Sequence, residues 1–200
     1  MRNCCPLVVL QEEENDVLSG TCPGSGFRSA EIWNFKPENT GFLTYNKTLV
    51  KLMGRARTAS LKATDSRQKK DHEGRWRTFL FIFACATVHQ LAGFFTAYLS
   101  QGRTYPVANE NEVGGHWLEC ILYGGSLETY QWRGAAPTDP ITLYFRGHSN
   151  KIRGHIDLET ITAFLNDPQQ LQLPPIIVED LTDKSIKRRG LQKMASTTPF

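Results

Sequence analysis

The stretch FLFIFACATVHQLAGFFTAYL, residues 79–99, is the most apolar part of the chain, and it carries His89 and Gln90 near its middle. A stretch of this length can cross a bilayer as a helix, and it equally suits the buried core helix of a globular domain. Each Leu, Ile, Phe or Val at the centre of a span contributes only about −0.3 to −0.6 kcal/mol to insertion, so a central imidazole and carboxamide offset much of the gain. We therefore expect a buried core helix, with a membrane span as the alternative.

A buried helix must give its polar side chains hydrogen-bond partners, because an unpaired buried polar group costs about 1–3 kcal/mol. Residues at i−4, i, i+3 and i+4 share one side of a helix, so Cys85, Ala92 and Gly93 form a narrow stripe of small residues around His89. Such a stripe lets a second helix approach closely. His89 is then either a structural core histidine or part of a site, and Cys85 is expected to be a core cysteine.

A second helix is expected over residues 112–123, EVGGHWLECILY, ending at a Gly-Gly turn. Glu112, His116 and Glu119 are spaced i, i+4 and i+7 in this helix, so they project from one side. If that side faces His89, the set is suited to binding a divalent metal or to acid/base chemistry. Alternatively, this side of the helix is a polar face exposed to solvent, and the three residues form no site.

The other segments predict a mostly α (α+β) domain, in which helices pack on the long central helix beside a small antiparallel hairpin. His148 and His155 bracket one end of this hairpin and are expected to lie at an exposed strand end. The predicted segments are a basic amphipathic helix over residues 47–61, an exposed linker over 62–75, strands at SLETYQW and ITLYFRG, a third short strand at KIRGHI, and a short helix at DLETITAFLND with an Asp cap.

A chain of 200 residues has room for one domain with a substantial core. Residues 1–30 mix Gly, Ser, Pro and acidic residues without a sustained period, which predicts a disordered leader. The polar and basic composition near the other end predicts a basic flexible tail over residues 179–200. The single folded domain is therefore expected over residues 31–178.

The amino-acid composition restricts the kinds of partner and the cellular compartment that we expect for this protein. Lys and Arg exceed Asp and Glu by only 23 to 20, in runs typical of solvated linkers and tails, so we expect no nucleic-acid partner. The five cysteines are odd in number and lack Cys-x-x-Cys spacing, which disfavours a disulfide framework, and the first residues lack the long apolar core of a secretory signal. We expect a cytoplasmic protein, with membrane association as the alternative.

The segments VHQLAGFFTAYL and NEVGGHWLECILYGG together resemble a family of small, uncharacterised fungal proteins. In that family the first helix carries His-Glu-x-x-His and the second carries a glycine- and glutamate-containing pattern that ends in a Gly-Gly turn. This arrangement is similar to the zincin metallopeptidase fold, where two histidines four apart bind zinc, the glutamate between them activates water, and a later glutamate completes the site. The resemblance covers residues 75–130 and implies that the domain of residues 31–178 is zincin-like.

The resemblance preserves the helical pattern better than the catalytic residues. His89 matches the first ligand, but Gln90 stands where the catalytic glutamate would be and Gly93 where the second histidine would be. A carboxamide cannot accept a proton from metal-bound water as a carboxylate can, and glycine offers no ligand. Glu112 or Glu119 matches the downstream glutamate. The resemblance therefore implies a degenerate zincin-like protein that has lost its metallopeptidase chemistry.

Three functional hypotheses follow. In the first, a polar pocket around His89 binds zinc through His89, His116 and either Glu112 or Glu119, or binds no metal and uses His89 and Glu119 for acid/base catalysis on a small molecule. In the second, the chain is a non-catalytic pseudoenzyme or interaction protein that binds a small molecule or a protein partner. In the third, residues 79–99 anchor a single-pass or peripheral membrane protein.

Overall fold

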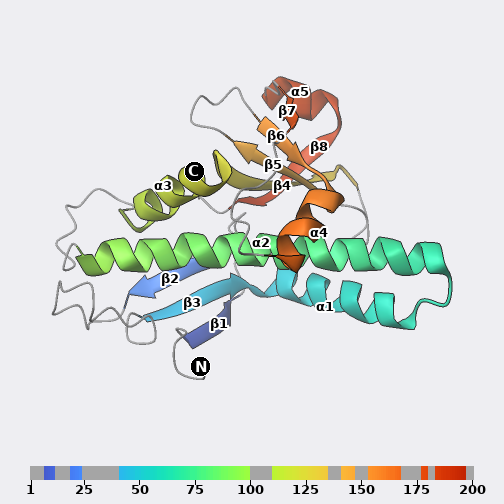
Figure 1. The fold of residues 1–200 in the computed structure, drawn as a ribbon, viewed down its shortest axis with the longest axis horizontal. Coiled ribbons are helices and arrows are strands. Elements are labelled where there is room, and N and C mark those ends of the chain that lie inside the picture. The colour runs from blue at the N-terminus through green and yellow to red at the C-terminus, as the bar shows by residue number, and fades with distance from the viewer. Residues whose placement is uncertain are drawn as a thin grey trace.

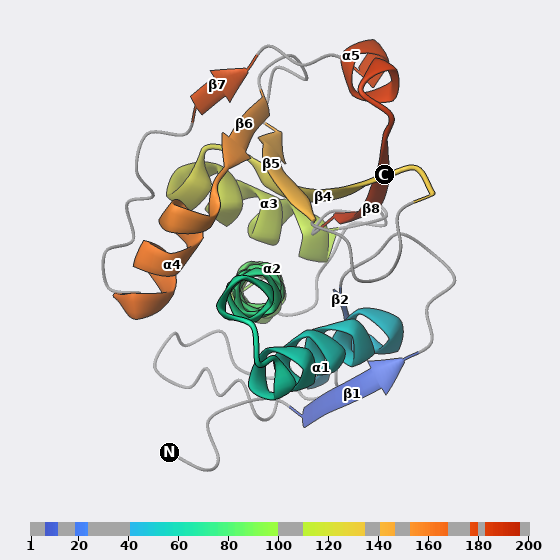
Figure 2. The same ribbon diagram turned by 90° about the vertical axis from the view of Figure 1, so that its right-hand side faces the viewer.

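The fold is mostly helical, with a small antiparallel sheet and a long central helix. Helix α2 (Ser66–Leu99) runs through the centre of the molecule, with the other elements around it (Figure 1). Seen along α2, helix α1 (Lys47–Lys62) lies on one side, while helices α3 (Glu110–Tyr123) and α4 (Leu158–Asn166) lie on the other (Figure 2). The computed structural model describes residues 7–11, 19–23, 41–99, 110–134, 141–146, 153–167, 177–179 and 183–196.

Helix α1 confirms the basic amphipathic helix predicted over residues 47–61. The side chain of Asn46 caps it by accepting hydrogen bonds from the backbone N–H groups of Thr48 and Leu49, at 3.0 and 3.2 Å. The apolar side of α1 packs on α2, where Leu49 is buried. The cap and the packed stripe together explain why this segment is helical.

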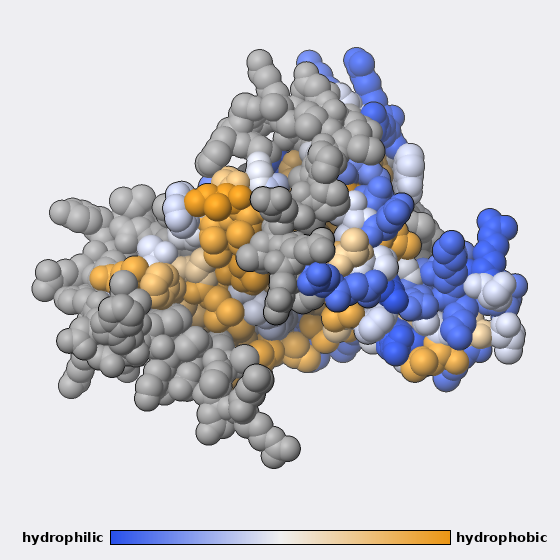
Figure 3. Space-filling view, in the orientation of Figure 1, coloured by the Kyte–Doolittle hydropathy of each residue, from blue (hydrophilic) through white to orange (hydrophobic). Residues whose placement is uncertain are grey.

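The exposed linker predicted over residues 62–75 is wrong in its conformation. Helix α2 begins at Ser66, so most of this polar segment is helical. Residues 64–71 are exposed as expected, whereas Gly74 and Arg75 at its end are buried. Its Arg, Gln, Lys and Glu residues are good helix formers, and the Asp65 carboxylate accepts a hydrogen bond from the N–H of Gln68 at 2.8 Å. Figure 3 shows that this end of the molecule is covered by hydrophilic residues.

The apolar half of α2 forms the main core. Among the described residues, α2 is the one helix long and apolar enough to cross a membrane, and 56% of its most apolar window is buried inside the structure. By length and composition it resembles a span, and by burial it is packed as a core helix. The buried core cluster around it comprises Leu49, Phe79, Phe81, Ile82, Cys85, Ala86, Tyr123, Leu127, Leu143, Phe145, Ile156 and Ile161.

The predicted hairpin is the middle of a larger antiparallel sheet. Strands β4 (Ser126–Trp132), β5 (Thr142–Arg146) and β6 (Arg153–Ile156) confirm the three predicted strands, and each pairs antiparallel with the next. Two further strands complete the order β7-β6-β5-β4-β8. Asp157 caps α4 by accepting a hydrogen bond from the N–H of Thr160, as the sequence predicts.

Strands from the leader and the tail take part in the sheets. Strand β8 (Leu191–Ser196) pairs with β4, and it follows helix α5 (Asp183–Arg188), while β7 (Ile177–Glu179) pairs with β6. In the leader, β1 (Leu7–Gln11) and β2 (Ser19–Pro23) flank β3 (Gly41–Asn46) in a separate three-stranded sheet. The described strands β1, β2 and β8 lie in segments expected to be a disordered leader and a flexible tail. Their partners β3 and β4 lie far along the chain, so the local sequence does not indicate these pairings.

Candidate functional site

Helices α2 and α3 approach closely because glycines of α3 face α2. A Cβ atom on Gly115 would lie 2.5 Å from Cδ2 of His89 and 2.6 Å from both its Nε2 and its carbonyl oxygen. A Cβ atom on Gly114 would meet the Thr96 side chain in the same way. At these separations a side chain at either position would force its neighbour to shift, so the glycines permit the close approach of the two helices. The imidazole of His89 is thus covered directly by the backbone of α3.

Glu119 of α3 meets His89 inside this contact. The Nδ1 atom of His89 lies 3.1 Å from Oε2 of Glu119, and the two side chains are 1% and 0% exposed. Neither carboxylate oxygen, nor Nδ1, has an aligned hydrogen-bond partner in the described part of the chain. The contact is therefore an electrostatic pairing with unused hydrogen-bonding capacity, fully enclosed between two helices.

Cys85 lies one turn before His89 on α2, and Tyr123 lies one turn after Glu119 on α3, so these two residues extend the buried polar contact between the helices. Burial raises the pKa of the Cys85 thiol well above its usual value, and the nearby Glu119 raises it further, against a smaller lowering by a hydrogen bond with Tyr123. Burial likewise raises the pKa of the Tyr123 phenol, with Cys85 as the next cause. A thiol that stays protonated is a poor nucleophile. Cys85 is accordingly placed as a core cysteine, as expected.

His116, another predicted ligand, is directed toward the sheet and away from His89. The Nδ1 atom of His116 lies 2.5 Å from Oγ of Ser126 in β4, and its Nε2 lies 3.7 Å from Sγ of Cys120. Residues three apart on a helix differ in direction by about 60°, which is enough to turn His116 toward the sheet while Glu119 faces α2. Glu112 lies in the first turn of α3, where the structure describes the backbone alone.

Zinc does not fit the side chains that the structure brings together. A structural or catalytic zinc site takes three or four protein ligands. The described residues contain no group of three His, Cys, Asp or Glu side chains placed to hold a metal ion, and the contact between helices supplies His89 and Glu119. Gln90 and Gly93, the two positions at which the resemblance to the zincin motif fails, are both buried.

A groove lies elsewhere, between the first half of α2, strand β6 and the start of α4. It encloses about 710 Å³, within the range typical of small-molecule sites. Gly74 allows α4 to approach α2 here, since a Cβ atom on it would lie 2.7 Å from Cδ2 of Leu158. The lining residues are Gln68, Lys70, Asp71, His72, Gly74, Arg75 and Thr78 of α2, together with Ile141, Thr142, His155, Ile156, Asp157, Leu158 and Ile161.

The groove has one charged wall and one apolar wall. Arg75 on the α2 side is only 8% exposed, and its guanidinium carbon lies 5.6 Å from the centre of the Phe79 ring. On the other side, His155 is half-buried and packs edge-on to Tyr144, so it is less exposed than its expected place at a strand end implies. His148 lies outside the described residues. A hydrogen bond from Thr160, with a smaller effect of His155, holds the pKa of the Asp157 carboxyl below its usual value.

A second set of buried charges lies on the sheet. Oε1 of Glu128 is 3.0 Å from Nε of Arg146 and 3.3 Å from Nζ of Lys193, and the hydroxyl of Tyr130 donates a hydrogen bond to Oε2 at 2.7 Å. These groups come from β4, β5 and β8, so the cluster links three neighbouring strands. The carboxylate of Glu128 faces two cations, and these contacts between strands suit a structural role.

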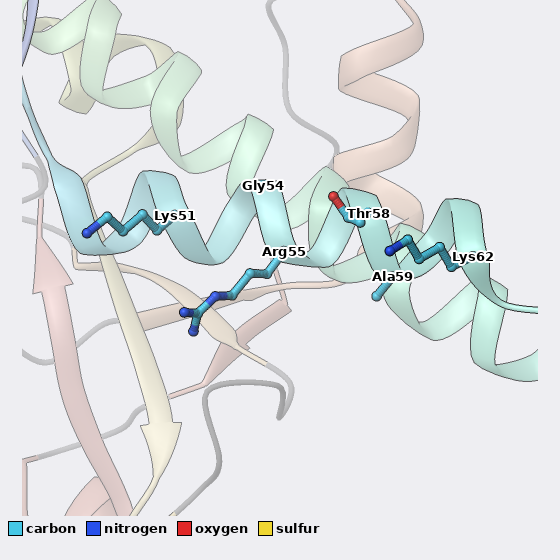
Figure 4. A pocket seen from close by; sticks show the side chains of 6 residues that line it. All are labelled: Lys51, Gly54, Arg55, Thr58, Ala59 and Lys62. Atoms are coloured by element: carbon cyan, nitrogen blue, oxygen red, sulfur yellow. The ribbon is translucent and has the colours of Figure 1, made fainter.

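The solvent side of α1 is a third surface with charged residues. Lys51, Arg55 and Lys62 border a shallow depression there with Gly54, Thr58 and Ala59. Figure 4 shows the three cationic side chains spread along the helix, without converging on one point. Cations arranged in this way are typical of a solvated helix face.

The groove was not predicted from the sequence, although one signal for it was present. Gly74 stands inside a helix of charged residues, where glycine costs about 1 kcal/mol relative to alanine. Such a residue indicates a close approach by another element. The partner elements, β6 and α4, could not be named from the local pattern because they lie far along the chain.

Comparisons with known proteins identify no relative. No protein-family model, curated protein or solved structure matches this chain. The resemblance to zincin-like fungal proteins therefore depends on the sequence of residues 75–130 alone.

Proposed function

We propose that the protein is a non-catalytic binding protein, whose ligand site is the groove between α2, β6 and α4. The observation that carries this proposal is the contrast between two sites. The groove is open and lined by a nearly buried arginine, whereas His89 and Glu119 are 1% and 0% exposed and covered by Gly115. A ligand must reach the groups that bind it, and of these two sites among the described residues the groove is the open one.

The pair of helices α2 and α3 is, in this proposal, a degenerate zincin-like frame whose chemistry has been lost. Support comes from Gln90 and Gly93 at the two altered motif positions and from the direct pairing of His89 with Glu119. The pairing makes the former catalytic face a structural contact. His89 then stabilises the packing of α3 and takes no part in acid/base catalysis.

The groove suits a small amphipathic anion. Ile156, Leu158 and Ile161 offer an apolar surface to a hydrocarbon body, and Arg75 lies on the opposite wall. Arg75 is shielded from water, and a guanidinium in such a place attracts a carboxylate or phosphate more strongly than an exposed one does. Asp157 also lines the groove, and its lowered pKa keeps the carboxylate ionised at neutral pH, so the anionic group of a ligand is expected on the Arg75 side.

Calorimetric titration with sodium octanoate tests the proposal, with uncharged 1-octanol as the matched probe. We expect one octanoate per chain, and a binding constant at least about tenfold weaker in Arg75→Ala, equivalent to about 1.4 kcal/mol. Binding of 1-octanol should change little. Arg77→Ala is the control, because Arg77 lies on the same helix but pairs with Glu73 at 3.0 Å outside the groove. Equal octanoate affinity in wild type and Arg75→Ala would contradict the proposal.

Metal analysis separates this proposal from the zinc hypothesis. We expect purified wild-type protein and His89→Ala to contain the same, substoichiometric amount of zinc, since the described residues supply too few ligands. One zinc per chain in wild type that is lost in His89→Ala would instead support a zinc site at His89. Peptide hydrolysis that a chelator abolishes would also support metallopeptidase activity.

A further inference from the structure

Strand β1 exposes an apolar edge. Leu7, Val8, Val9 and Leu10 are 69%, 51%, 37% and 49% exposed, so apolar side chains project from both faces of this strand. Among the described strands β1 pairs with β3 alone, which makes it an edge strand of its sheet. Its outer edge therefore offers backbone N–H and C=O groups between exposed valines and leucines. Such an edge is a template for pairing with another strand.

The two edges of this sheet differ in their capacity for pairing. The sequence of β1, LVVLQ, contains none of the lysine, proline or inward-facing charge that blocks strand addition. The opposite edge, β2, reads SGTCP and contains Gly20 and Pro23, which weaken a strand and remove a hydrogen-bond donor. One edge of the sheet is thus open to a partner strand, and the other is protected.

We propose that β1 pairs antiparallel with β1 of a second copy of this chain, joining two three-stranded sheets into one of six strands. Val9 is the middle residue of β1, and a two-fold axis beside it would place Val9 opposite Val9 of the second copy. Val8 would then lie opposite Leu10. Cross-strand pairs of β-branched and aliphatic side chains stabilise a sheet. Because β2 is protected, the association closes at the dimer.

The negative charge next to β1 favours antiparallel over parallel pairing, and it favours a second copy of this chain over an acidic partner peptide. Three glutamates, Glu12 to Glu14, follow β1 directly in the sequence. Parallel pairing of two copies would bring these acidic runs side by side at about 4.8 Å, where they repel. Antiparallel pairing separates them by the length of the strand, about 17 Å. An acidic partner peptide is disfavoured for the same reason, whereas the apolar strand is self-complementary.

Five paired residues form a small interface, so the dimer is expected to be weak and concentration-dependent. Sedimentation equilibrium of the full chain over about 5–500 µM measures it. We expect a monomer–dimer equilibrium that Val9→Lys abolishes, since that change sets two ammonium groups opposite each other. Leu61→Lys is the control, because Leu61 is 69% exposed on α1 and far from this edge in the sequence. A monomer at every concentration, or an open series of larger species, would overturn the proposal.

A cysteine variant tests the register even if Val9→Lys perturbs folding. In a background with Cys4, Cys5 and Cys22 changed to serine, Val9→Cys should form a disulfide-linked dimer with oxidised glutathione. Residues directly opposite in a ladder have Cα atoms about 4.5–5.5 Å apart, within disulfide reach. Leu7→Cys in the same background should not, since it faces Gln11 of the second copy. Equal cross-linking of the two variants, or none, would overturn the register.

Discussion

The missing side chain at Gly115 allows α3 to lie directly on the imidazole of His89. The same contact brings Glu119 within 3.1 Å of Nδ1 of His89. A buried ion pair adds little net stability by itself, but removing one partner leaves an uncompensated polar group and is costly. At the scale of single residues, His89 and Glu119 therefore form part of the packing contact between α2 and α3.

Gly115→Ala should destabilise the protein by about 1–3 kcal/mol, because the new Cβ atom must displace the His89 ring or its carbonyl group. Urea unfolding measures the change. Gly54→Ala is the matched control, since Gly54 lies in α1 with nothing within 4 Å of the added Cβ atom. There the substitution should stabilise by up to about 1 kcal/mol. Equal effects of the two substitutions would show that α3 does not pack as described.

The contact between His89 and Glu119 could be anticipated from sequence, whereas the fate of His116 could not. From helical spacing we expected His116 and Glu119 on one face of their helix. The resemblance to the zincin fold implied that this face is directed at His89. Spacing does not resolve which of two residues about 60° apart points at a neighbour. The contact with Ser126 sets the direction of the His116 side chain. The position of Ser126 itself depends on the turn and strand that follow the helix.

At the scale of elements, end caps and distant packing decide where helices begin. The polar segment before Arg75 is helical because Asp65 caps it and α1 lies beside it, although its composition alone predicts a linker. Helix α4 was easier to predict, because Asp157 carries its cap in the local sequence. Local signals therefore predicted the short, capped helix correctly and missed the first third of α2.

Asp157 gives α4 a pH-dependent cap. Its pKa is held below 3.8, chiefly by the hydrogen bond from Thr160, so its stabilising effect is present above that pH and is lost as the pH falls through the lower, folded-state pKa. Asn at this position accepts the same hydrogen bond without titrating. We expect Asp157→Asn to match wild type within about 0.5 kcal/mol at pH 6 and to gain relative to it near pH 3. Thermal unfolding at both pH values tests this, and a constant difference would contradict it.

At the scale of the whole molecule, strands distant in the sequence complete the fold. Strand β8 pairs with β4, and its Leu191 is buried in a cluster with Tyr130, Tyr144 and Ile186. The tail carries no strong alternation, and the pairing joins residues that are far apart in the chain. Helices α1, α3 and α4, the apolar part of α2 and the middle strands were therefore predictable from the sequence, whereas α5 and the strands whose stability comes from non-local pairing were not.

Removal of β8 should expose the edge of β4 and the cluster beneath it. A chain ending at Gly190 is expected to unfold at a clearly lower urea concentration than the full chain, and to aggregate more readily. A chain ending at Ser196 keeps all of β8 and should unfold close to the full chain. If both truncations behave alike, the tail is dispensable and β8 does not stabilise the sheet.

The location of ligand binding tests the central claim most directly. We propose that the binding chemistry lies in the groove and that the enclosed contact of His89 with Glu119 is structural. In an amide NMR titration with octanoate, the account predicts shifts that saturate at Thr78, Ile156 and Ile161, which line the groove, while Gly115 against His89 remains unchanged. Shifts that centre on Gly115 and leave the groove residues unaffected would contradict it.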